Sequence, residues 1–299
     1  MKILLYNRNH DAWKGGDAVQ VENTMTILQK LGVDCEYSCD PNISFDNFNF
    51  VHVFHVNFKW TKDICTRLIS ARKPYFISSI FFPKEYGVSF MEMKGFIDNS
   101  LQTIALSTAE RQEMIDLLHC DPNLISIISN GVNKEVFYKD DTKRDDFIVS
   151  IGRLQQMKGP QYLIEACKRL GKKLRYISSD SNDPEAYKLI PMFDEYFENI
   201  TEKEVANILK RSRLYVCPSL TERQSLGVLE AANCGLPIVD SVYNRGNDLL
   251  PSSIVVNPKN IEELMEAITN AWDKPRNTDH VPSWEDIGTK LIKLYKQHI

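Results

Sequence analysis

The sequence predicts an α/β protein built from two doubly wound domains, each with a parallel sheet. Apolar runs of strand length alternate with segments of helical periodicity along the whole chain. This alternation requires right-handed crossover connections, which build parallel sheets. A charged run poor in apolar residues, YKDDTKRDD at 138–146, interrupts the pattern once, and such runs are typically solvated linkers. A chain of 299 residues is long enough for two domains of ordinary size.

The first half of the chain contains five predicted strands. Each is a short apolar run, and the runs lie at 2–6, 50–56, 74–80, 101–107 and 124–129. After the first of them, Val21, Leu28 and Leu31 recur at helical spacing, and Gly32 ends that helix. The first half is therefore expected to alternate strands with helices.

The second half repeats this organisation after the charged run. Five strands are predicted, at 147–152, 174–179, 214–219, 237–241 and 253–256. Helices are predicted between or after them, at 162–171, 204–212, 226–235 and 261–272. The C-terminal segment carries Ile287, Leu291 and Leu294 at helical spacing, which predicts one more helix at the end of the chain.

Composition and charge exclude several classes of protein. Hydrophobic residues make up 43% and charged residues 25% of the chain, which excludes a disordered, collagen-like or coiled-coil protein. The net charge of −4 provides no global attraction to nucleic acid, so a nucleic-acid partner is an alternative that we do not favour. The seven cysteines are scattered without a CxxC pair, which argues against a zinc site or a disulfide framework.

The N-terminal apolar run is short and is soon followed by charged and amide residues, unlike a signal peptide. No segment reaches the roughly 18 apolar residues of a membrane span. We therefore expect a cytoplasmic protein, with a peripheral position at the membrane as the alternative.

Paired glycines follow the first predicted strand. Gly15 and Gly16 open the next helix. Glycine lets the backbone approach a ligand closely, and the amino end of a helix favours an anionic group. The segment is not a GxGxxG dinucleotide fingerprint, so a plain loop remains the alternative.

Two basic residues follow the first predicted strand of the second half. Arg153 and Lys158 lie in SIGRLQQMKGP at 150–160, at the carboxyl end of a parallel strand, where open α/β sheets bind their ligands. The planar fork of an arginine and the point charge of a lysine suit a diphosphate. The alternative is a pair of solvated cations in a loop.

Two glutamates are eight residues apart across a strand–loop–helix junction. The helix is expected to begin near Gln224 or Ser225, which places Glu222 before its first turn and Glu230 two turns inside. Carboxylates here can accept hydrogen bonds from sugar or ribose hydroxyls, and the backbone N–H groups of 224–227 have no partner within the helix. A solvated helix face is the alternative.

Together these segments resemble the retaining nucleotide-sugar glycosyltransferases of the GT-B fold, glycosyltransferase family 4. The resemblance covers nearly the whole chain and rests on five segments in order: the glycines at 15–16, ISNGVNKEVF at 128–137, IGRLQQMKG at 151–159, E-x7-E at 222–230 and a final helix entered through Trp284. It implies two Rossmann-like domains facing a cleft. These are an acceptor-side domain at 1–140 and a donor-binding domain at 146–283, with the helix at 284–299 packing back on the first domain.

The resemblance also implies a role for each matching residue. Arg153 and Lys158 hold the donor diphosphate and stabilise the leaving group, and Glu222 contacts the donor sugar near the reacting carbon, so these three are the catalytic candidates. Glu230 binds the ribose hydroxyls. The resemblance implies donor contacts at four more residues. Gln224, Ser225 and Leu226 would contact the donor through their backbone, and Gly16 would leave room beside the diphosphate. Neither a metal nor a cofactor is expected, because Arg153 and Lys158 supply the positive charge.

Two departures from the family pattern leave the sugar-binding side open. The family commonly has Phe-Gly where this chain has Gln224-Ser225. It often has a histidine near residue 78, where this chain has Ser78, and His55 on the preceding strand is a candidate to approach the same place. Further candidate contacts to the acceptor or the sugar are Asp17 and Gln20.

An aromatic-rich segment lies in the first half. It contains Phe81, Phe82, Tyr86, Phe90 and Phe96. Core packing and a lipid- or glycan-facing surface are the competing interpretations, and we favour core packing.

The expected activity is that of a retaining, metal-independent hexosyltransferase. A UDP- or GDP-activated sugar would pass to an acceptor hydroxyl during synthesis of a surface polysaccharide, a lipid-linked glycan or another glycoconjugate. Three alternatives stay open: glycosylation of a modified nucleic-acid base, a non-catalytic nucleotide-sugar-binding subunit, and a sugar-nucleotide epimerase.

Overall fold

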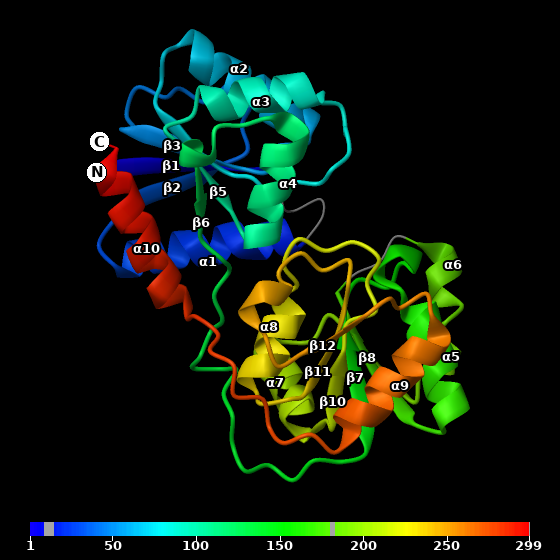
Figure 1. The fold of residues 1–299 in the computed structure, drawn as a ribbon. Coiled ribbons are helices and arrows are strands. Elements are labelled where there is room, and N and C mark those ends of the chain that lie inside the picture. Colours follow the sequence, from blue (N-terminus) through cyan, green and yellow to red (C-terminus); the bar gives the residue numbers. More distant parts are fainter. Residues whose placement is uncertain (9–14, 180–182, 299) are drawn as a thin grey trace. The chain divides into compact units, whose positions relative to one another are not determined.

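The computed structural model describes residues 1–8, 15–179 and 183–298. The chain divides into two compact units (Figure 1). The first unit comprises Met1–Gly131 and Trp284–Ile299, and the second comprises Val132–Ser283.

The first unit contains a six-stranded sheet in the order β2-β1-β3-β4-β5-β6, with every pair of neighbours parallel. Its strands are β1 Lys2–Tyr6, β2 Asp34–Ser38, β3 Phe50–Phe54, β4 Tyr75–Ser78, β5 Gln102–Ala105 and β6 Ile125–Ile127. Its helices are α1 Gly16–Lys30, α2 Lys59–Ser70, α3 Phe90–Asp98, α4 Thr108–Leu118, the 3-10 turn η1 Pro122–Leu124 and α10 Trp284–Gln297. Figure 1 shows α1 and α10 on one face of this sheet and α2, α3 and α4 on the other.

The C-terminal helix α10 belongs to the core of the first unit. The Tyr295 ring lies 4.9 Å from the rings of Phe50 and of Phe76, and its hydroxyl lies 2.6 Å from His52 Nδ1. A Cβ atom added at Gly288 would lie 3.0–3.1 Å from side-chain atoms of Ile27 on α1 and 2.9 Å from Leu31 Cδ1 just after it, so this glycine lets α1 and α10 approach closely. Burial lowers the pKa of His52 to about 3 and keeps its ring neutral within the core.

The second unit contains a parallel sheet in the order β12-β11-β10-β7-β8-β9. Its strands are β7 Phe147–Ile151, β8 Lys173–Ser178, β9 Glu195–Glu198, β10 Leu214–Val216, β11 Ile238–Ser241 and β12 Ile254–Val256. Its α-helices are α5 Pro160–Leu170, α6 Pro184–Tyr187, α7 Glu202–Arg211, α8 Leu226–Asn233 and α9 Ile261–Trp272, and its 3-10 turns are η2 Gln156–Lys158, η3 Ile190–Met192 and η4 Asn247–Leu249. Figure 1 shows α7 and α8 on one face of the sheet and α5 and α9 on the other.

Two strands, β2 and β9, were not predicted from the sequence. Each is an edge strand of its sheet, and most of their side chains are exposed or half-buried. An edge strand with one solvated side needs no continuous apolar run, so DCEYS and EYFE carry little strand signal. The eight central strands are buried more fully, and their apolar runs did predict them, as did the short apolar runs of the other two edge strands, β6 and β12.

The second unit begins earlier than the sequence boundary of 140–146. Val132 and Phe137 are 1% and 2% exposed and pack in the core of the second unit. The charged run is also held by that unit rather than solvated along its whole length. Asp145 lies 2.7 Å from the guanidinium of Arg175, which is 4% exposed, and Lys210 lies 3.4 Å from Asp140.

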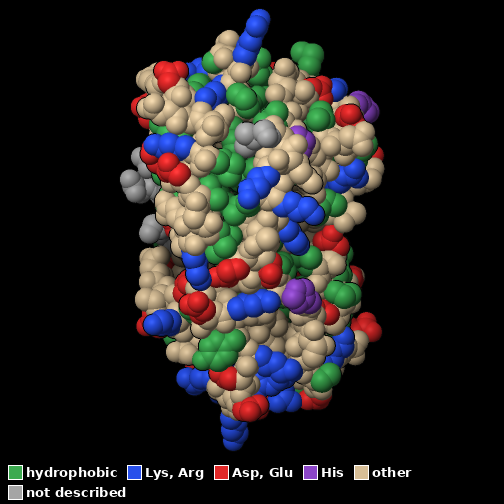
Figure 2. Space-filling model, turned by 90° about the vertical axis from the view of Figure 1, so that its left-hand side faces the viewer, with side chains coloured by type: hydrophobic (Ala, Val, Ile, Leu, Met, Phe, Trp, Pro, Cys, Tyr) green, Lys and Arg blue, Asp and Glu red, His purple; other side chains and the backbone are tan. Residues whose placement is uncertain are grey.

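Charged side chains of both signs occur on the surface of each unit. Figure 2 shows basic and acidic side chains intermixed over one face of the molecule, in keeping with the small net charge of −4. Within the described residues, no helix combines the length and the apolar character needed to cross a bilayer.

Candidate functional site

The strand order of the second sheet creates a switch point between β7 and β10. From β7 the chain proceeds to β8 and β9 on one side, and from β10 to β11 and β12 on the other. The loops at the carboxyl ends of these two adjacent strands therefore diverge, and open α/β sheets bind ligands at such a position. Arg153 and Lys158 follow β7, and Glu222 follows β10.

A glycine contact holds these two loops together. Gly159 adopts φ +70°, and a Cβ atom added there would lie 2.0 Å from the carbonyl oxygen of Pro218. The amide of Leu220 also donates a hydrogen bond to the carbonyl of Met157 at 2.9 Å. Only glycine permits this approach of the two backbones, so the loop after β7 has a fixed position against the loop after β10.

Lys158 and Glu222 form an ion pair across the switch point. Lys158 Nζ lies 2.6 Å from Glu222 Oε1, and the two side chains are 16% and 17% exposed. The hydroxyl of Ser219 donates to the same carboxylate oxygen at 3.1 Å. The backbone of Glu222 is fixed as well, because its amide donates to the carbonyl of Tyr243 at 3.1 Å. Both charged groups are thus oriented by neighbouring polypeptide.

Arg153 lies in the same loop as Lys158. Its side chain is half-buried, and its carbonyl accepts a hydrogen bond of 3.3 Å from the hydroxyl of Tyr176 on β8. The amide of the next residue, Leu154, donates to Ser178 Oγ at 3.1 Å. The loop that carries both basic residues is therefore anchored on β8 as well as on the loop after β10.

Helix α8 begins where the sequence predicted, with Ser225 as the residue before its first turn. Gly227 in that turn is close to two strands, because a Cβ atom there would lie 2.7 Å from Tyr215 Oη and 3.1 Å from Ile151 Cβ. The side chain of Gln224 is buried, and a Cβ atom added at Gly246 would lie 2.7 Å from its Cγ. The amino end of α8, with Leu226 as its first residue, thus lies at the carboxyl edge of β7 and β10.

Two carboxyl groups of the second unit have raised pKa values. Burial raises the pKa of Glu230 to about 8, and the carboxylate of Glu202 adds to this effect. Burial also raises the pKa of Asp240 to about 7, although the Ser241 amide and the Asn244 side chain each donate a hydrogen bond to it at 2.8 Å. Asp240 was not predicted as a site residue from the sequence. Its only signal was a charged residue inside the apolar run PIVDS.

In the first unit, Asp17 is held by the residues that follow β1. Its two carboxylate oxygens accept hydrogen bonds from Arg8 at 2.8 and 2.9 Å, and Asn7 donates a third at 3.4 Å. Burial would raise the pKa of Asp17, but the hydrogen bonds and the charge of Arg8 outweigh burial and lower it. A Cβ atom at Gly15 would lie 2.7 Å from Asp17 Oδ1, whereas one at Gly16 would meet no atom of the described residues within 4 Å.

Gln20 and His55 are both buried, at 7% and 4% exposure. Gln20 lies on α1. His55 follows β3 with φ +78°, and its ring centroid is 4.4 Å from that of Phe58 and 5.7 Å from that of Phe82. The charge of His55 also lowers the pKa of Asp17. Among the predicted site residues, the structure brings Lys158 and Glu222 into direct contact within the second unit.

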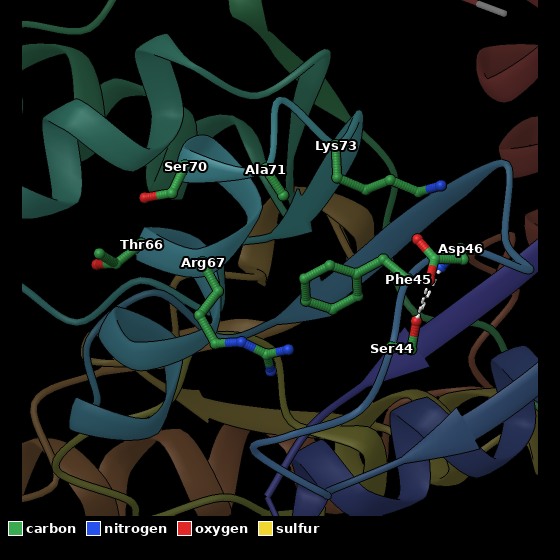
Figure 3. Close-up of a pocket in the computed structure, with 8 residues that line it drawn as sticks. All are labelled: Ser44, Phe45, Asp46, Thr66, Arg67, Ser70, Ala71 and Lys73. Atoms are coloured by element: carbon green, nitrogen blue, oxygen red, sulfur yellow. Dashed lines mark hydrogen bonds between the residues drawn. The ribbon is translucent and has the colours of Figure 1, made fainter.

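The first unit has a hollow of about 520 Å³. It is formed by the segment before β3 and the end of α2, and Figure 3 shows the Phe45 ring beside the Arg67 guanidinium. Arg67 donates to the carbonyl of Ile43 at 2.7 Å, and Lys73 donates to the carbonyl of Phe48. These cations hold the loop before β3 in place, so we assign the hollow a structural role.

The sequence of the second unit matches a known protein family. Residues 145–274 match the family described as "Glycosyl transferases group 1". A galactosyltransferase of Escherichia coli, described as "UDP-Gal:alpha-D-GlcNAc-diphosphoundecaprenol alpha-1,3-galactosyltransferase", is 28% identical over 203 residues, which are 57% of this chain and 51% of that protein. The "Phosphatidylinositol N-acetylglucosaminyltransferase gpi3 subunit" of Schizosaccharomyces pombe is 26% identical over 64% of this chain and 48% of its own. The chain thus spans about half the length of these curated relatives.

Solved structures share the fold of the whole chain. Sucrose-phosphate synthase from Thermosynechococcus elongatus has a TM-score of 0.84 at 16% identity, covering 99% of this chain and 98% of its own. HepE from Anabaena, solved in complex with UDP and glucose, has a TM-score of 0.73 at 14% identity, with the same coverage. Together with the two six-stranded parallel sheets, this likeness confirms the predicted GT-B fold class.

Proposed function

We propose that this chain, whose residues 145–274 match the glycosyl transferases group 1 family, transfers a hexose from a nucleotide-sugar donor to an acceptor hydroxyl with retention of configuration. The observation that carries the proposal is the placement of Arg153, Lys158 and Glu222 at the switch point of the second sheet, beside the amino end of α8. Basic side chains and helix N–H groups at one such edge suit an anionic ligand that carries hydroxyls.

Arg153 and Lys158 would bind the donor diphosphate. A nucleoside diphosphate leaves with about two negative charges, so positive charge that is already in place lowers the barrier to departure. Lys158 is held 2.6 Å from Glu222, and the loop that carries both basic residues is anchored on β8 and on Pro218. Little reorganisation is needed when the diphosphate arrives. Because these two cations neutralise the leaving group, the proposed reaction needs no metal ion.

The remaining donor contacts follow from the same geometry. Glu222 would contact the donor sugar, since its carboxylate lies beside the lysine that holds the diphosphate. Glu230, half-buried on α8, would accept hydrogen bonds from the ribose hydroxyls. The backbone of Gln224, Ser225 and Leu226 would contact the sugar and the phosphates through the first turn of α8.

The first unit would supply contacts to the acceptor or the sugar. Gly16 opens α1, and a Cβ atom added there would meet no atom of the described residues within 4 Å, so glycine would let the donor or the acceptor approach the backbone closely at this point. Asp17 and His55, which are electrostatically coupled, and Gln20 are the candidate side chains. Asp17 is the strongest of these, because Arg8 and Asn7 fix its orientation.

The names of the relatives guide the choice of substrates. The E. coli relative is named for UDP-galactose and a diphosphoundecaprenol-linked acceptor, and the S. pombe relative for phosphatidylinositol. HepE structures contain UDP or UDP-glucose. We therefore favour a UDP-sugar over a GDP-sugar donor for this chain. As acceptor we favour a lipid-linked glycan or another glycoconjugate, reached from the cytoplasm by peripheral association with the membrane.

A non-catalytic nucleotide-sugar-binding subunit is the second candidate. The observation in its favour is Gln224-Ser225 in place of the Phe-Gly pair expected from the family pattern, since the Gln224 side chain is buried against Gly246 and changes the wall beside α8. Glycosylation of a nucleic-acid base is less well supported, because the net charge of −4 offers no broad attraction to phosphates.

Nucleotide release in the absence of an acceptor separates these candidates. The protein is incubated with UDP-sugars and GDP-sugars, and the free nucleotide and the anomer of the released sugar are followed by NMR. A retaining transferase slowly releases UDP together with the sugar in its original anomeric form, and the double variant Arg153→Ala, Lys158→Ala does not. Binding of UDP without release of any nucleotide would favour the subunit, and failure to bind any nucleotide would contradict both.

A further inference from the structure

Four aromatic side chains gather at one edge of the first sheet. Phe58 and Trp60 follow β3, and Phe82 and Tyr86 follow β4. Strands β3 and β4 are adjacent and parallel, so both segments leave the same carboxyl edge. We call these four residues the aromatic platform.

The rings of the platform contact one another and stay accessible. The Phe58 ring lies 6.2 Å from Trp60 with an angle of 18° between their planes, and 5.5 Å from Tyr86 with an angle of 30°. Phe82 meets Tyr86 edge-on at 6.3 Å. Tyr86 is 37% exposed and the other three are half-buried, and Trp60 also packs against the core of the first unit.

The sequence left two interpretations open for the aromatic-rich segment, core packing and an exposed surface. In the structure, its aromatic residues fall into two groups. Phe81 and Phe96, at 0% and 6% exposure, belong to the core, as favoured from the sequence. Phe90 is half-buried and packs against that core. Phe82 and Tyr86 instead face outward with the platform. Core packing explains Phe81, Phe90 and Phe96, but it does not explain Phe82 and Tyr86.

Hydrogen bonds hold the platform in a fixed arrangement. The side chain of Asn57 donates to the carbonyl of Phe82 at 2.7 Å and accepts from its amide at 2.9 Å. The buried carboxylate of Glu110 accepts hydrogen bonds from Ser79 Oγ at 2.7 Å and from the Phe81 amide at 2.6 Å. The loops are thus ordered before any ligand arrives, which lowers the entropic cost of binding.

Both loops also contain backbone strain. His55 has φ +78° and the β-branched residue Ile80 has φ +41°, a region that costs such residues roughly 1–3 kcal/mol. Strain of this kind persists where the surroundings enforce it, and it clusters at ligand-binding sites. Here it occurs once in each of the two loops that carry the platform.

The platform adjoins the switch point of the first sheet. The chain proceeds from β1 to the edge strand β2, whereas β3 leads to β4, β5 and β6 on the other side. The crevice of the sheet is therefore expected at the carboxyl ends of β1 and β3. The His55 ring contacts both Phe58 and Phe82, which links the platform to the candidate acceptor residues.

Positive charge borders the platform. Lys59 and Lys84 are exposed, and Lys84 Nζ lies 5.2 Å from the centre of the Tyr86 ring. Within the described parts of the chain, neither ammonium group has an acidic partner within ion-pair distance. The neighbouring carboxylate of Glu85 accepts a hydrogen bond of 2.8 Å from the Phe90 amide. Lys59, Lys84 and Glu85 together leave a net positive charge beside the platform, which favours a negative group.

We propose that the aromatic platform binds a sugar ring that carries a phosphate or another anionic group, as a subsite for the acceptor. The C–H faces of a pyranose carry partial positive charge and suit the negative faces of aromatic rings. The lysines would bind the anionic group, and the hydroxyl of Tyr86 and the indole N–H of Trp60 can serve the sugar hydroxyls. The inference rests on the proposed function, because it identifies the class of acceptor for that reaction.

Saturation-transfer NMR with glucose 1-phosphate as the probe tests this subsite. Saturating UDP is present to occupy the donor site. Glucose and phosphatidylglycerol vesicles are measured separately, and inorganic phosphate is added as a competitor. We expect millimolar binding of glucose 1-phosphate, with saturation transfer from aromatic protons to the sugar C–H protons. Glucose should bind more weakly through the same protons, and inorganic phosphate should displace glucose 1-phosphate only weakly.

Variants locate the binding on the platform. Tyr86→Ala and Trp60→Leu should each weaken binding of glucose 1-phosphate by roughly three- to tenfold, the range expected for one aromatic contact. Lys84→Gln should reduce the preference for glucose 1-phosphate over glucose. Met91→Ala, at a side chain that is 81% exposed on α3 of the same unit, should change nothing. Tyr86 is exposed, so its variant is expected to fold normally even if Trp60→Leu does not, and circular dichroism checks both.

Three results would overturn the inference: no binding of glucose 1-phosphate by the wild type, equal binding by wild type and Tyr86→Ala, or platform-dependent binding of vesicles without binding of the sugar. UDP titration of the same variants keeps the two proposals apart. Unchanged UDP binding with lost sugar binding affects only the platform, whereas absent UDP binding in the wild type contradicts the donor site of the second unit.

Discussion

Lys158 Nζ lies 2.6 Å from Glu222 Oε1, and this ion pair joins the loops that follow β7 and β10. The two residues are far apart in the sequence, and they meet because Gly159 lies against the backbone of Pro218. In the proposed reaction, one partner of the pair binds the diphosphate and the other contacts the sugar. The bond that would break joins the sugar to the diphosphate. The ion pair therefore holds the residues proposed to contact its two sides next to each other.

Replacing Glu222 by glutamine should lower turnover more than donor binding. The amide keeps the shape of the side chain but removes the charge near the reacting carbon, and Lys158 stays available for the diphosphate. We expect kcat to fall by roughly tenfold or more, in line with the loss of one charged contact made in the transition state, while the Kd for UDP changes little. Steady-state kinetics together with UDP titration measures the two effects, and a change confined to Kd would contradict this role.

The raised pKa of Glu230 should make the stability of the second unit depend on pH. The folded state favours the protonated form, so its contribution to the free energy of unfolding is fully present below the ordinary pKa of 4.5 and is lost as pH rises toward about 8. Asp240, with its pKa raised to about 7, acts in the same direction over an overlapping range. Urea unfolding across this range should show falling stability in the wild type and a smaller slope in Glu230→Gln. An equal slope in both would contradict the assignment.

Gly159 and Gly171 form a matched pair for testing the contact between the two loops. Both have positive φ, at +70° and +61°, but a Cβ atom would clash with Pro218 only at Gly159, and at Gly171 it would meet no atom within 4 Å. Gly171→Ala should cost about 1 kcal/mol, the cost of the left-handed backbone alone. Gly159→Ala should cost at least about 2 kcal/mol because the backbone must also shift, and it should weaken UDP binding. Similar losses for the two variants would show that the contact is not required.

Tyr295→Phe tests the attachment of α10 to the first unit. The change removes a buried hydroxyl that lies 2.6 Å from His52 Nδ1 and leaves a buried polar atom without its partner. The first unit should lose about 1–3 kcal/mol of stability, measured by chemical unfolding monitored through near-ultraviolet circular dichroism. His52 Nε2 lies 2.9 Å from Ser78 Oγ, so Ser78→Ala serves as the comparison from the other side of the ring. A neutral Tyr295→Phe would contradict a structural role for this bond.

The sequence predicted the central strands because they are buried on both faces and read as apolar runs. Strands β2 and β9 escaped prediction because they are edge strands with polar side chains. The segment from Val132 to Phe137 was placed in the wrong unit by composition, since the charged run after it resembles a linker although Arg175 and Lys210 bind its aspartates. The pattern of apolar and charged residues along the chain indicates which residues are buried, but not in which of the two units a segment packs.

For the candidate site, the sequence indicated the residue types and their strand ends, but not their contacts. Arg153, Lys158 and Glu222 could each be placed in a loop after a predicted strand, because the motifs that contain them are recognisable in the sequence. The ion pair depends on strand order, which brings β7 next to β10, and on the close approach at Gly159. The aromatic platform likewise depends on the pairing of β3 with β4, so local sequence did not separate Phe82 from its buried neighbour Phe81.

Calorimetric titration of UDP and of uridine into the wild type, Arg153→Ala and Lys158→Ala tests the central claim most directly. If the two basic residues bind the diphosphate, each variant should lose roughly 1.5–3 kcal/mol of UDP affinity, about ten- to 150-fold. Uridine should bind all three proteins equally, because it has no phosphate. A preference for UDP over uridine that is the same in the variants as in the wild type would contradict the assignment of the donor site.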